Sequence, residues 1–310
     1  MASTLRISSS SRWRRRWQPR AVTPLVQRIA WLMLIAQSGI VVSGGIVRLT
    51  GSGLGCPTWP RCTDESWATT PAMGIHGFIE YGNRMLGVLL GLIGLLSIFV
   101  VWRLRKHRPD LFIFAFSLTA IVPIQAVIGG ISVHMELNPW IVAAHFIPSA
   151  IAVAVSAIFV RRTYDTGIRD ASLSRPASLK IIGLCITVLT IVVVVLGVLT
   201  TGAGPHAGDA QSARNGLDPL LISRLHALPV WLLVGVTIGG LFLAQRYRLQ
   251  MVIRTFGVLF LVELAQGAIG YVQYFLGLPE AIVALHLLGA CAVIAAAAAA
   301  VDSLYPRKKS

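Results

Sequence analysis

The sequence predicts an all-α integral membrane protein whose eight transmembrane helices form two repeated four-helix bundles. Of its 310 residues, 55% are hydrophobic and only 13% are charged, about half the charged share of an ordinary soluble domain. Apolar stretches of about 20 residues, each long enough to cross the hydrocarbon core of a bilayer as a helix, recur along the chain. Segments of the first half also reappear in the second half.

Short polar loops separate the eight apolar stretches. The predicted spans lie near residues 25–47, 83–102, 111–133, 140–160, 180–201, 225–245, 252–275 and 281–301. Only five Arg residues, at positions 48, 61, 84, 214 and 224, lie on one side of this topology, whereas the other 22 of the 27 Lys and Arg residues lie on the side of the termini. Cytoplasmic loops are enriched in Lys and Arg, so both termini are predicted to be cytoplasmic. The net charge of +15 then reflects topology and attraction to anionic lipids, and nucleic-acid binding is not expected.

This topology divides the chain into five segments. They are a basic cytoplasmic tail (1–24), an N-terminal four-helix half (25–162), a cytoplasmic linker (163–179), a C-terminal four-helix half (180–302) and a second cytoplasmic tail (303–310). The Arg- and Ser-rich first residues also have the composition of a transit peptide. We interpret them as a tail that orients the first helix.

The internal repeat covers two successive helices in one register. Residues 125–129 (QAVIG) correspond to 266–270 (QGAIG), and residues 141–145 (IVAAH) correspond to 282–286 (IVALH), both at an offset of 141 residues. Each half has an even number of spans, so both halves have the same orientation. They are therefore predicted to be parallel repeats, related by an axis along the membrane normal.

Four repeat-related positions inside the spans are polar. His145 and His286 are equivalent and lie near the same end of the fourth and eighth spans, whereas Asn83 of the second span corresponds to His226 of the sixth. Polar and ionisable residues inside a membrane are costly and mark functional sites. Two histidines facing each other across a four-helix bundle suit the axial positions of haem iron. Hydrogen-bonded packing is the competing interpretation, but a repeated set at one depth favours iron ligation.

Glu80 lies three residues before Asn83 and therefore on the same helix face. Two interpretations stay open at this stage. Arg84, four residues further on, can pair with Glu80 and anchor the helix end. Alternatively, the carboxylate faces the same pocket as His145 and transfers protons there.

The four cysteines fall into two groups. Cys56 and Cys62 share the first loop on the side away from the termini, where an oxidising compartment permits a disulfide. Metal ligation by this pair is the weaker alternative, because further ligands are not close in sequence. Cys185 and Cys291 lie in apolar spans and are expected to pack there. The histidines that we do not expect to be permanent iron ligands are His76, His107, His134 and His206.

Taken together, these residues resemble the haem A synthase family over about residues 30–300. The resemblance rests on residues 44–62 (GGIVRLTGSGLGCPTWPRC), on residues 80–87 (EYGNRMLG) and on the three histidines of the spans. It implies an oxidoreductase that converts the C8 methyl group of haem O to a formyl group, with water as the oxygen source and successive two-electron steps. It also implies a permanent haem b in the C-terminal half and a substrate haem in the N-terminal half.

Carried over by position, the resemblance assigns a role to each residue. His226 and His286 would bind haem b, His145 would bind the substrate haem, Glu80 would be the catalytic carboxylate, and Cys56 and Cys62 would be the family's external cysteine pair. The chain departs from the family pattern at Asn83, where many members have histidine. Because an amide is a poor iron ligand, we expect the substrate haem to lack a second protein ligand.

The resemblance also implies a multi-pass protein of a bacterial plasma membrane. Its expected partners are haem O, a quinone as electron acceptor, haem O synthase as supplier and cytochrome c oxidase as recipient. Two other classes compete with this interpretation: a membrane cytochrome b that only carries electrons, and a transporter built from duplicated bundles. A pure electron carrier would have two symmetric sites, and Asn83 breaks that symmetry.

Overall fold

The computed structural model describes residues 21–165 and 176–305. Much of the predicted 1–24 tail, most of the 163–179 linker and the end of the 303–310 tail lie outside this part. Its regular structure is helical, with eight α-helices and two short 3-10 helices, η1 (Pro71–Met73) and η2 (Trp102–Leu104). The α-helices are α2 (Pro24–Leu49), α3 (Gly74–Val101), α4 (Pro109–His134), α5 (Pro139–Thr163), α6 (Ala177–Ala203), α7 (Pro219–Arg246), α8 (Gln250–Phe275) and α9 (Glu280–Asp302). All eight are long and apolar enough to cross a membrane, so the predicted eight-helix membrane fold is confirmed.

Two helices begin well before the spans read from the sequence. Helix α3 begins at Gly74 rather than near residue 83, and α7 begins at Pro219 rather than near residue 225. Hydropathy locates the apolar part of a helix and misses polar turns that extend beyond it. Proline suits the first turn of a helix, where its missing N–H is not needed, and the side chain of Asp218 accepts a hydrogen bond from the N–H of Leu221 at 2.7 Å.

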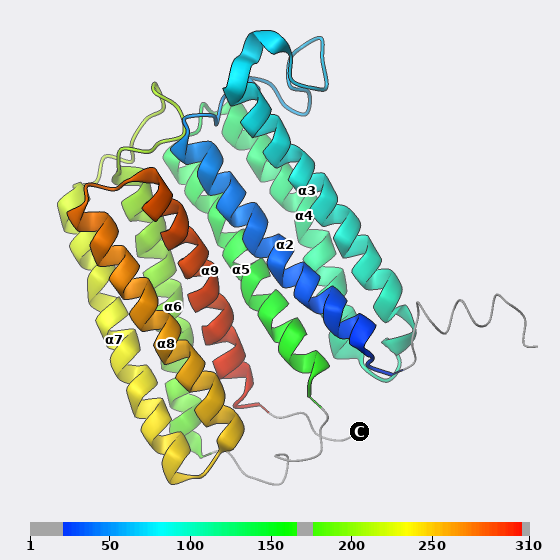
Figure 1. Ribbon diagram of the computed structural model, residues 1–310, viewed down its shortest axis with the longest axis vertical. Coiled ribbons are helices and arrows are strands. Elements are labelled where there is room, and N and C mark those ends of the chain that lie inside the picture. Colours follow the sequence, from blue (N-terminus) through cyan, green and yellow to red (C-terminus); the bar gives the residue numbers. More distant parts are fainter. Residues whose placement is uncertain (1–20, 166–175, 306–310) are drawn as a thin grey trace, which may run out of the picture.

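The helices pack as two rings of four (Figure 1). In the N-terminal half, α2 packs on α3, α3 on α4, α4 on α5, and α5 back on α2; the C-terminal half repeats this order from α6 to α9. Helices α3 and α5 therefore face each other across one bundle, and α7 and α9 across the other. The halves meet through α5 and α9, with α2 also against α9 and α5 against α6. The axis along the membrane normal and the cytoplasmic position of the termini stay predictions.

The largest apolar clusters lie toward one end of each bundle. Met33 and Phe159 belong to the cluster of the N-terminal half, Phe256 and Leu259 to that of the C-terminal half, and all four are almost fully buried. We call this the tail end, because the described chain starts and finishes there (Figure 1). The opposite end carries the loop with Cys56, and we call it the disulfide end. His145, His286, Asn83 and His226 lie between the apolar clusters and the disulfide end.

Polar contacts join the two halves at both ends. At the tail end, Asp302 of α9 accepts hydrogen bonds from Arg161 at 2.6 Å and from Arg162 at 2.5 Å, both on α5. At the disulfide end, Arg48 of α2 donates to the carbonyl oxygens of His206 at 2.6 Å and Thr201 at 3.1 Å. These contacts fix the relative position of the two bundles.

Candidate functional site

The structure places the predicted polar positions at the disulfide end of each bundle. His145 and His286 both lie six residues after the first residue of their helices, α5 and α9, or about 9 Å along the helix axis. Asn83 lies on α3 and His226 on α7. Each bundle therefore carries one polar pair on two helices that face each other across its axis.

His226 is held by the neighbouring helix α6. Its Nδ1 lies 3.0 Å from the carbonyl oxygen of Val193, so the neutral ring donates from Nδ1 and keeps the Nε2 lone pair for a metal. Gly197 of α6 lies against the ring, since a Cβ there would be 3.1 Å from Cε1 of His226. The ring is therefore oriented by one hydrogen bond and by one glycine.

His286 is held in a similar way by α8. The amide Nε2 of Gln266 donates to the carbonyl oxygen of His286 at 2.9 Å and lies 3.0 Å from its Nδ1. A Cβ at Gly270 would be 3.2 Å from Cε1 of the ring. An amide N–H can only donate, so Nδ1 accepts in this arrangement and Nε2 carries the proton of the neutral ring. Nε2 becomes available to a metal when the amide is turned so that its oxygen accepts from Nδ1–H.

His145 of α5 contacts equivalent residues of α4, with one difference. Gln125 donates to the carbonyl oxygen of His145 at 3.0 Å and also contacts the hydroxyl group of Ser149. A Cβ at Gly129 would be 3.4 Å from Cε1 of His145. However, the Nδ1 atom of His145 is buried and has no hydrogen-bond partner among the described residues. Buried polar atoms are normally paired, so this nitrogen marks a site that is completed by another group.

Asn83 is tied to helix α2. Its side-chain oxygen accepts a hydrogen bond of 2.7 Å from the hydroxyl group of Ser43. At the offset of 151 between α2 and α6, Ser43 corresponds to Val194, which adjoins the residue that holds His226. Positions 83 and 226 therefore contact the preceding helix at the same level, but one offers an amide and the other an imidazole.

Both side-chain oxygens of Glu80 are engaged. Oε2 accepts a 2.5 Å hydrogen bond from the backbone N–H of Cys56, and Oε1 accepts one of 2.5 Å from the guanidinium of Arg84. Arg84 also donates to the carbonyl oxygens of Cys56 and Thr58, each at 3.0 Å. The Glu–Arg pair considered from the sequence is thus present. It anchors the cysteine loop to α3 and holds the buried carboxylate at the disulfide end of the N-terminal bundle.

The predicted disulfide between Cys56 and Cys62 is present, and both residues are fully buried. Between them, the ring of Trp59 packs directly on Gly130 of α4, where a side chain would collide with it. Gly130 adjoins Gly129, which lies against His145. The loop therefore covers the N-terminal bundle beside this histidine. The sequence indicates this contact indirectly. The C-terminal half has Tyr271 at the position equivalent to Gly130, so the small residue is specific to the half that carries the loop.

The other histidines contact loops. His76 Nδ1 lies 2.9 Å from the hydroxyl oxygen of Ser52, His134 Nε2 lies 3.2 Å from the carbonyl oxygen of Trp59, and His206 Nε2 lies 3.1 Å from that of Leu278. His107 lies at the tail end, between η2 and α4. The structure thus assigns the first three to loop packing at the disulfide end.

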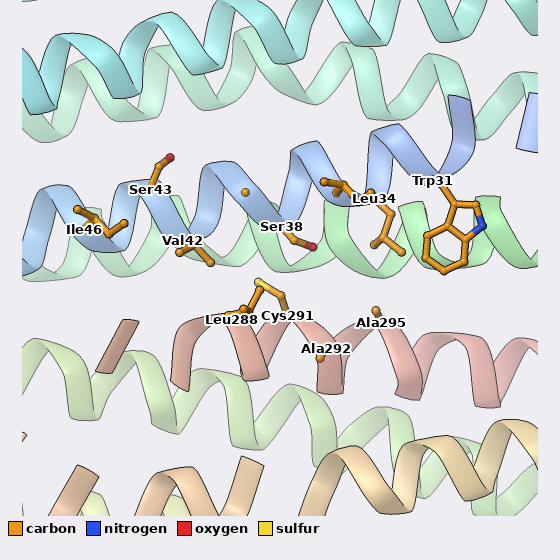
Figure 2. Close-up of a pocket in the computed structure, with 12 residues that line it drawn as sticks. Trp31, Leu34, Ser38, Val42, Ser43, Ile46, Leu288, Cys291, Ala292 and Ala295 are labelled. Carbon is orange, nitrogen blue, oxygen red and sulfur yellow. The ribbon is translucent and has the colours of Figure 1, made fainter. Parts of the chain in front are cut away.

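A groove of about 500 Å³ lies outside both bundles, between α2 and α9 (Figure 2). Ser38 extends from α2 toward Cys291 of α9 and Trp31 lies on the side of Ala295, whereas Ser43 points away from α9, toward Asn83. The lining is almost entirely apolar and contains no charged residue. The groove suits hydrocarbon and is separate from the histidine positions.

One buried acid was not singled out from the sequence. Glu263 of α8 is 3% exposed and accepts a hydrogen bond of 2.9 Å from the hydroxyl group of Thr237 on α7. In the sequence, Glu263 is an acidic residue in the middle of an apolar span. Comparison of the two repeats does not reveal it, because the equivalent position in the first half is Val122.

Comparison with known proteins identifies relatives of the chain. The family model COX15-CtaA, described as a cytochrome oxidase assembly protein, matches residues 27–211. Three similar curated proteins are called Heme A synthase. The protein of Alkalihalophilus pseudofirmus is 30% identical over 129 residues, covering 41% of this chain and 43% of the relative. That of Exiguobacterium sibiricum is 31% identical over 169 residues, covering 53% and 55%.

The third relative, from Methylobacterium radiotolerans, is 28% identical over 229 residues, covering 64% of this chain and 62% of the relative. The chain thus spans about two fifths to three fifths of the length of these curated relatives. The family model covers the N-terminal bundle, its disulfide loop and α6. It ends before His226 and His286, so the C-terminal site stands on the geometry described above.

Proposed function

Because the chain belongs to the COX15-CtaA family of cytochrome oxidase assembly proteins, we propose that it is a haem A synthase of a bacterial plasma membrane. This oxidoreductase converts the C8 methyl group of haem O to a formyl group. The observation that carries the proposal is the repeated arrangement in which a glutamine and a glycine of one helix contact a histidine of the next. One bundle offers two oriented imidazoles, whereas the other offers one imidazole opposite an amide. A duplicated fold with two different sites suits one resident haem and one haem that is exchanged.

The C-terminal bundle has the donor set for haem b. His226 and His286 face each other across the bundle, their Nδ1 atoms are engaged at 3.0 Å, and small glycines leave room beside both rings. These two residues would hold the iron through Nε2. When bound with two histidine ligands, haem b supplies electron transfer rather than oxygen chemistry.

The N-terminal bundle has the features of a site for exchange. His145 would bind the iron of the substrate haem, and the amide of Asn83 leaves the opposite position without a protein ligand. The unpaired Nδ1 of His145 would gain a partner, such as water, in the loaded site. The disulfide loop, with Trp59 against Gly130, covers this bundle and keeps bulk water from the reacting group.

Glu80 is the proton acceptor in this proposal. Converting a methyl group to a formyl group with one water molecule releases four protons and four electrons in two successive two-electron oxidations. Each carboxylate oxygen of Glu80 accepts one hydrogen bond, from Cys56 or Arg84, and keeps a further lone pair for a water proton. Glu80 would orient the water and accept its proton, a role that in enzymes typically contributes 10²–10⁴-fold in rate.

The electrons leave through the C-terminal half to an acceptor in the membrane. We propose a quinone as that acceptor, haem O synthase as the supplier of substrate, and cytochrome c oxidase as the destination of haem A. The last partner is supported by the family description, which refers to the assembly of cytochrome oxidase.

The proposal is tested by pigment analysis. The protein is produced in a host that lacks haem A, with and without a supply of haem O, and the extracted haems are separated by chromatography. Haem A should be detected only when haem O is supplied. Bound haem b without any haem A, under both conditions, would instead identify a membrane cytochrome b that carries electrons.

A further inference from the structure

Glu263 places a carboxyl group in the middle of the C-terminal bundle. It lies 13 residues after Gln250 and 12 residues before Phe275, the two ends of α8, or about 20 Å from the tail end along the helix axis. Its side chain is 3% exposed. An ionisable group at this depth is costly and is retained for a function, such as proton transfer.

The two side-chain oxygens of Glu263 have different surroundings. Oε1 accepts the hydrogen bond of Thr237, which is itself fully buried. Oε2 is buried and has no hydrogen-bond partner among the described residues. An ionised carboxylate with one unpaired oxygen is strongly disfavoured in an apolar core, and a proton on Oε2 removes that cost. These surroundings therefore favour the protonated carboxyl group.

This carboxyl group belongs to only one of the two halves. The repeat places Val122 at the position of Glu263, and Gly94 at the position of Thr237. In turn, the position of Glu80 is occupied by Ser223 in the C-terminal half. The buried pair of Glu263 and Thr237 thus accompanies the bundle with two histidines.

The surroundings of Glu263 differ between its two sides along α8. Gln266, one helical turn further along α8, contacts His286. On the tail side, Leu259 and Phe256 belong to a fully buried apolar cluster with Leu233 of α7. Proton exchange is therefore expected from the disulfide end, past the histidine site, and not from the tail end.

The other titratable groups near Glu263 have separate surroundings. Helices α7 and α9 pack on α8. The ionisable residues of these three helices are Arg224, His226 and Arg246 on α7, Arg254, Tyr271 and Tyr274 on α8, and Glu280, His286, Cys291 and Asp302 on α9. Cys291, which is closest in depth, faces the groove toward α2, and Asp302 is paired with two arginines at the tail end. Glu263 is thus the acid placed to respond to the histidine site.

We propose that Glu263 is a proton-binding site coupled to electron transfer in the C-terminal half. One electron arriving at the site of His226 and His286 is matched by one proton, taken from water onto Oε2 of Glu263. Both leave when the electron passes to the acceptor. The physical reason is charge balance, because an added negative charge in a medium of low dielectric constant favours neutralisation of the nearby carboxylate. This inference rests on the proposed function only in requiring a redox-active haem at the two histidines.

The test is a redox titration of the haem in the purified full-length protein at several pH values. In the wild type, the midpoint potential should fall as the pH rises, because reduction takes up a proton. In Glu263→Gln, which keeps the size and cannot ionise, this dependence should be lost. Glu280→Gln, an exposed acid on α9, is the matched control and should behave like the wild type.

Infrared difference spectra of the wild type keep the test independent of whether the variant folds. Reduction should produce the carbonyl band of a protonated carboxyl group, and Thr237→Val should shift this band. A wild-type potential that does not depend on pH, or spectra without a carboxyl band, would show that Glu263 is permanently neutral and structural. A protein that binds no haem overturns both proposals, whereas Glu263-dependent proton uptake without haem A formation overturns only the proposed function.

Discussion

The two halves of this protein share one frame and differ in what it holds. In both, a glutamine and a glycine on the third helix position a histidine on the fourth: Gln125 and Gly129 for His145, Gln266 and Gly270 for His286. The shared part is therefore a glutamine bound to the backbone carbonyl of the histidine and a glycine beside the ring, whereas only Gln266 also contacts the ring itself. The difference lies in the opposite helix, where the N-terminal half has Asn83 and the C-terminal half has His226.

The two halves also differ in their acidic residues and in the loop that covers the N-terminal bundle. The N-terminal half adds Glu80 and a disulfide loop that rests on Gly130, next to the histidine position. In the C-terminal half, Tyr271 stands at the position of Gly130, and this half adds the buried Glu263. In the proposed function, this division separates a half for chemistry on an exchanged substrate from a half for electrons and their charge balance.

The largest expected effect is loss of the resident haem. His226→Ala or His286→Ala leaves one axial ligand in a bundle built for two, so the purified variants should lack haem b. His145→Ala, the equivalent change in the other half, should retain it. Haem content is measured by the pyridine haemochrome method. Full haem b content in both C-terminal variants would remove the proposed difference between the halves.

Loss of the carboxylate should stop the reaction while leaving haem binding in place. Glu80→Gln is expected to lower haem A formation by about 10²–10⁴-fold, the usual contribution of a general base. The change is read from the ratio of haem A to haem O in extracted pigments. The control is Glu65→Gln, which changes an exposed acid in the loop between α2 and α3. A wild-type ratio in Glu80→Gln would reduce Glu80 to the anchor of the cysteine loop.

A smaller effect on haem affinity is expected when the glutamine that contacts each histidine is replaced. Gln266→Leu removes the amide that engages His286, and loss of such a partner typically costs 10–100-fold in metal affinity. Gln125→Leu should weaken the substrate haem and spare haem b. Each variant is titrated with haem by absorption spectroscopy. Equal losses of haem b affinity in both variants would contradict the proposal that each glutamine supports only the haem of its own half.

The smallest effect is expected from the disulfide. Replacing Cys56 and Cys62 by serine should lower stability by about 2 kcal/mol, toward the low end of measured disulfide contributions because the closed loop is short. The loop stays attached through Glu80 and Arg84, so haem b should be unchanged. Thermal unfolding measures the loss. In the wild type, thiol labelling of the denatured, unreduced protein should modify Cys185 and Cys291 only, and labelling of the loop cysteines would contradict the disulfide.

Hydropathy was sufficient to predict the eight helices. It failed at helix ends: α3 continues beyond Glu80 to Gly74, but His76, Glu80 and Arg84 lower the hydropathy of this part of the helix. Glu263 was also missed, since a search for repeated residues overlooks a residue that is present in one half only. Contacts of Trp59 with Gly130 depend on how a loop folds back, which sequence spacing does not determine.

The central claim is that the N-terminal haem has one protein ligand and the C-terminal haem has two. Resonance Raman spectroscopy of the substrate-loaded protein tests it most directly, with Asn83→His as the matched variant. The wild type should show one six-coordinate low-spin haem with two histidines and a second haem without this signature. In Asn83→His, the second haem should become six-coordinate and low-spin. A loaded wild type with two bis-histidine haems would contradict the account.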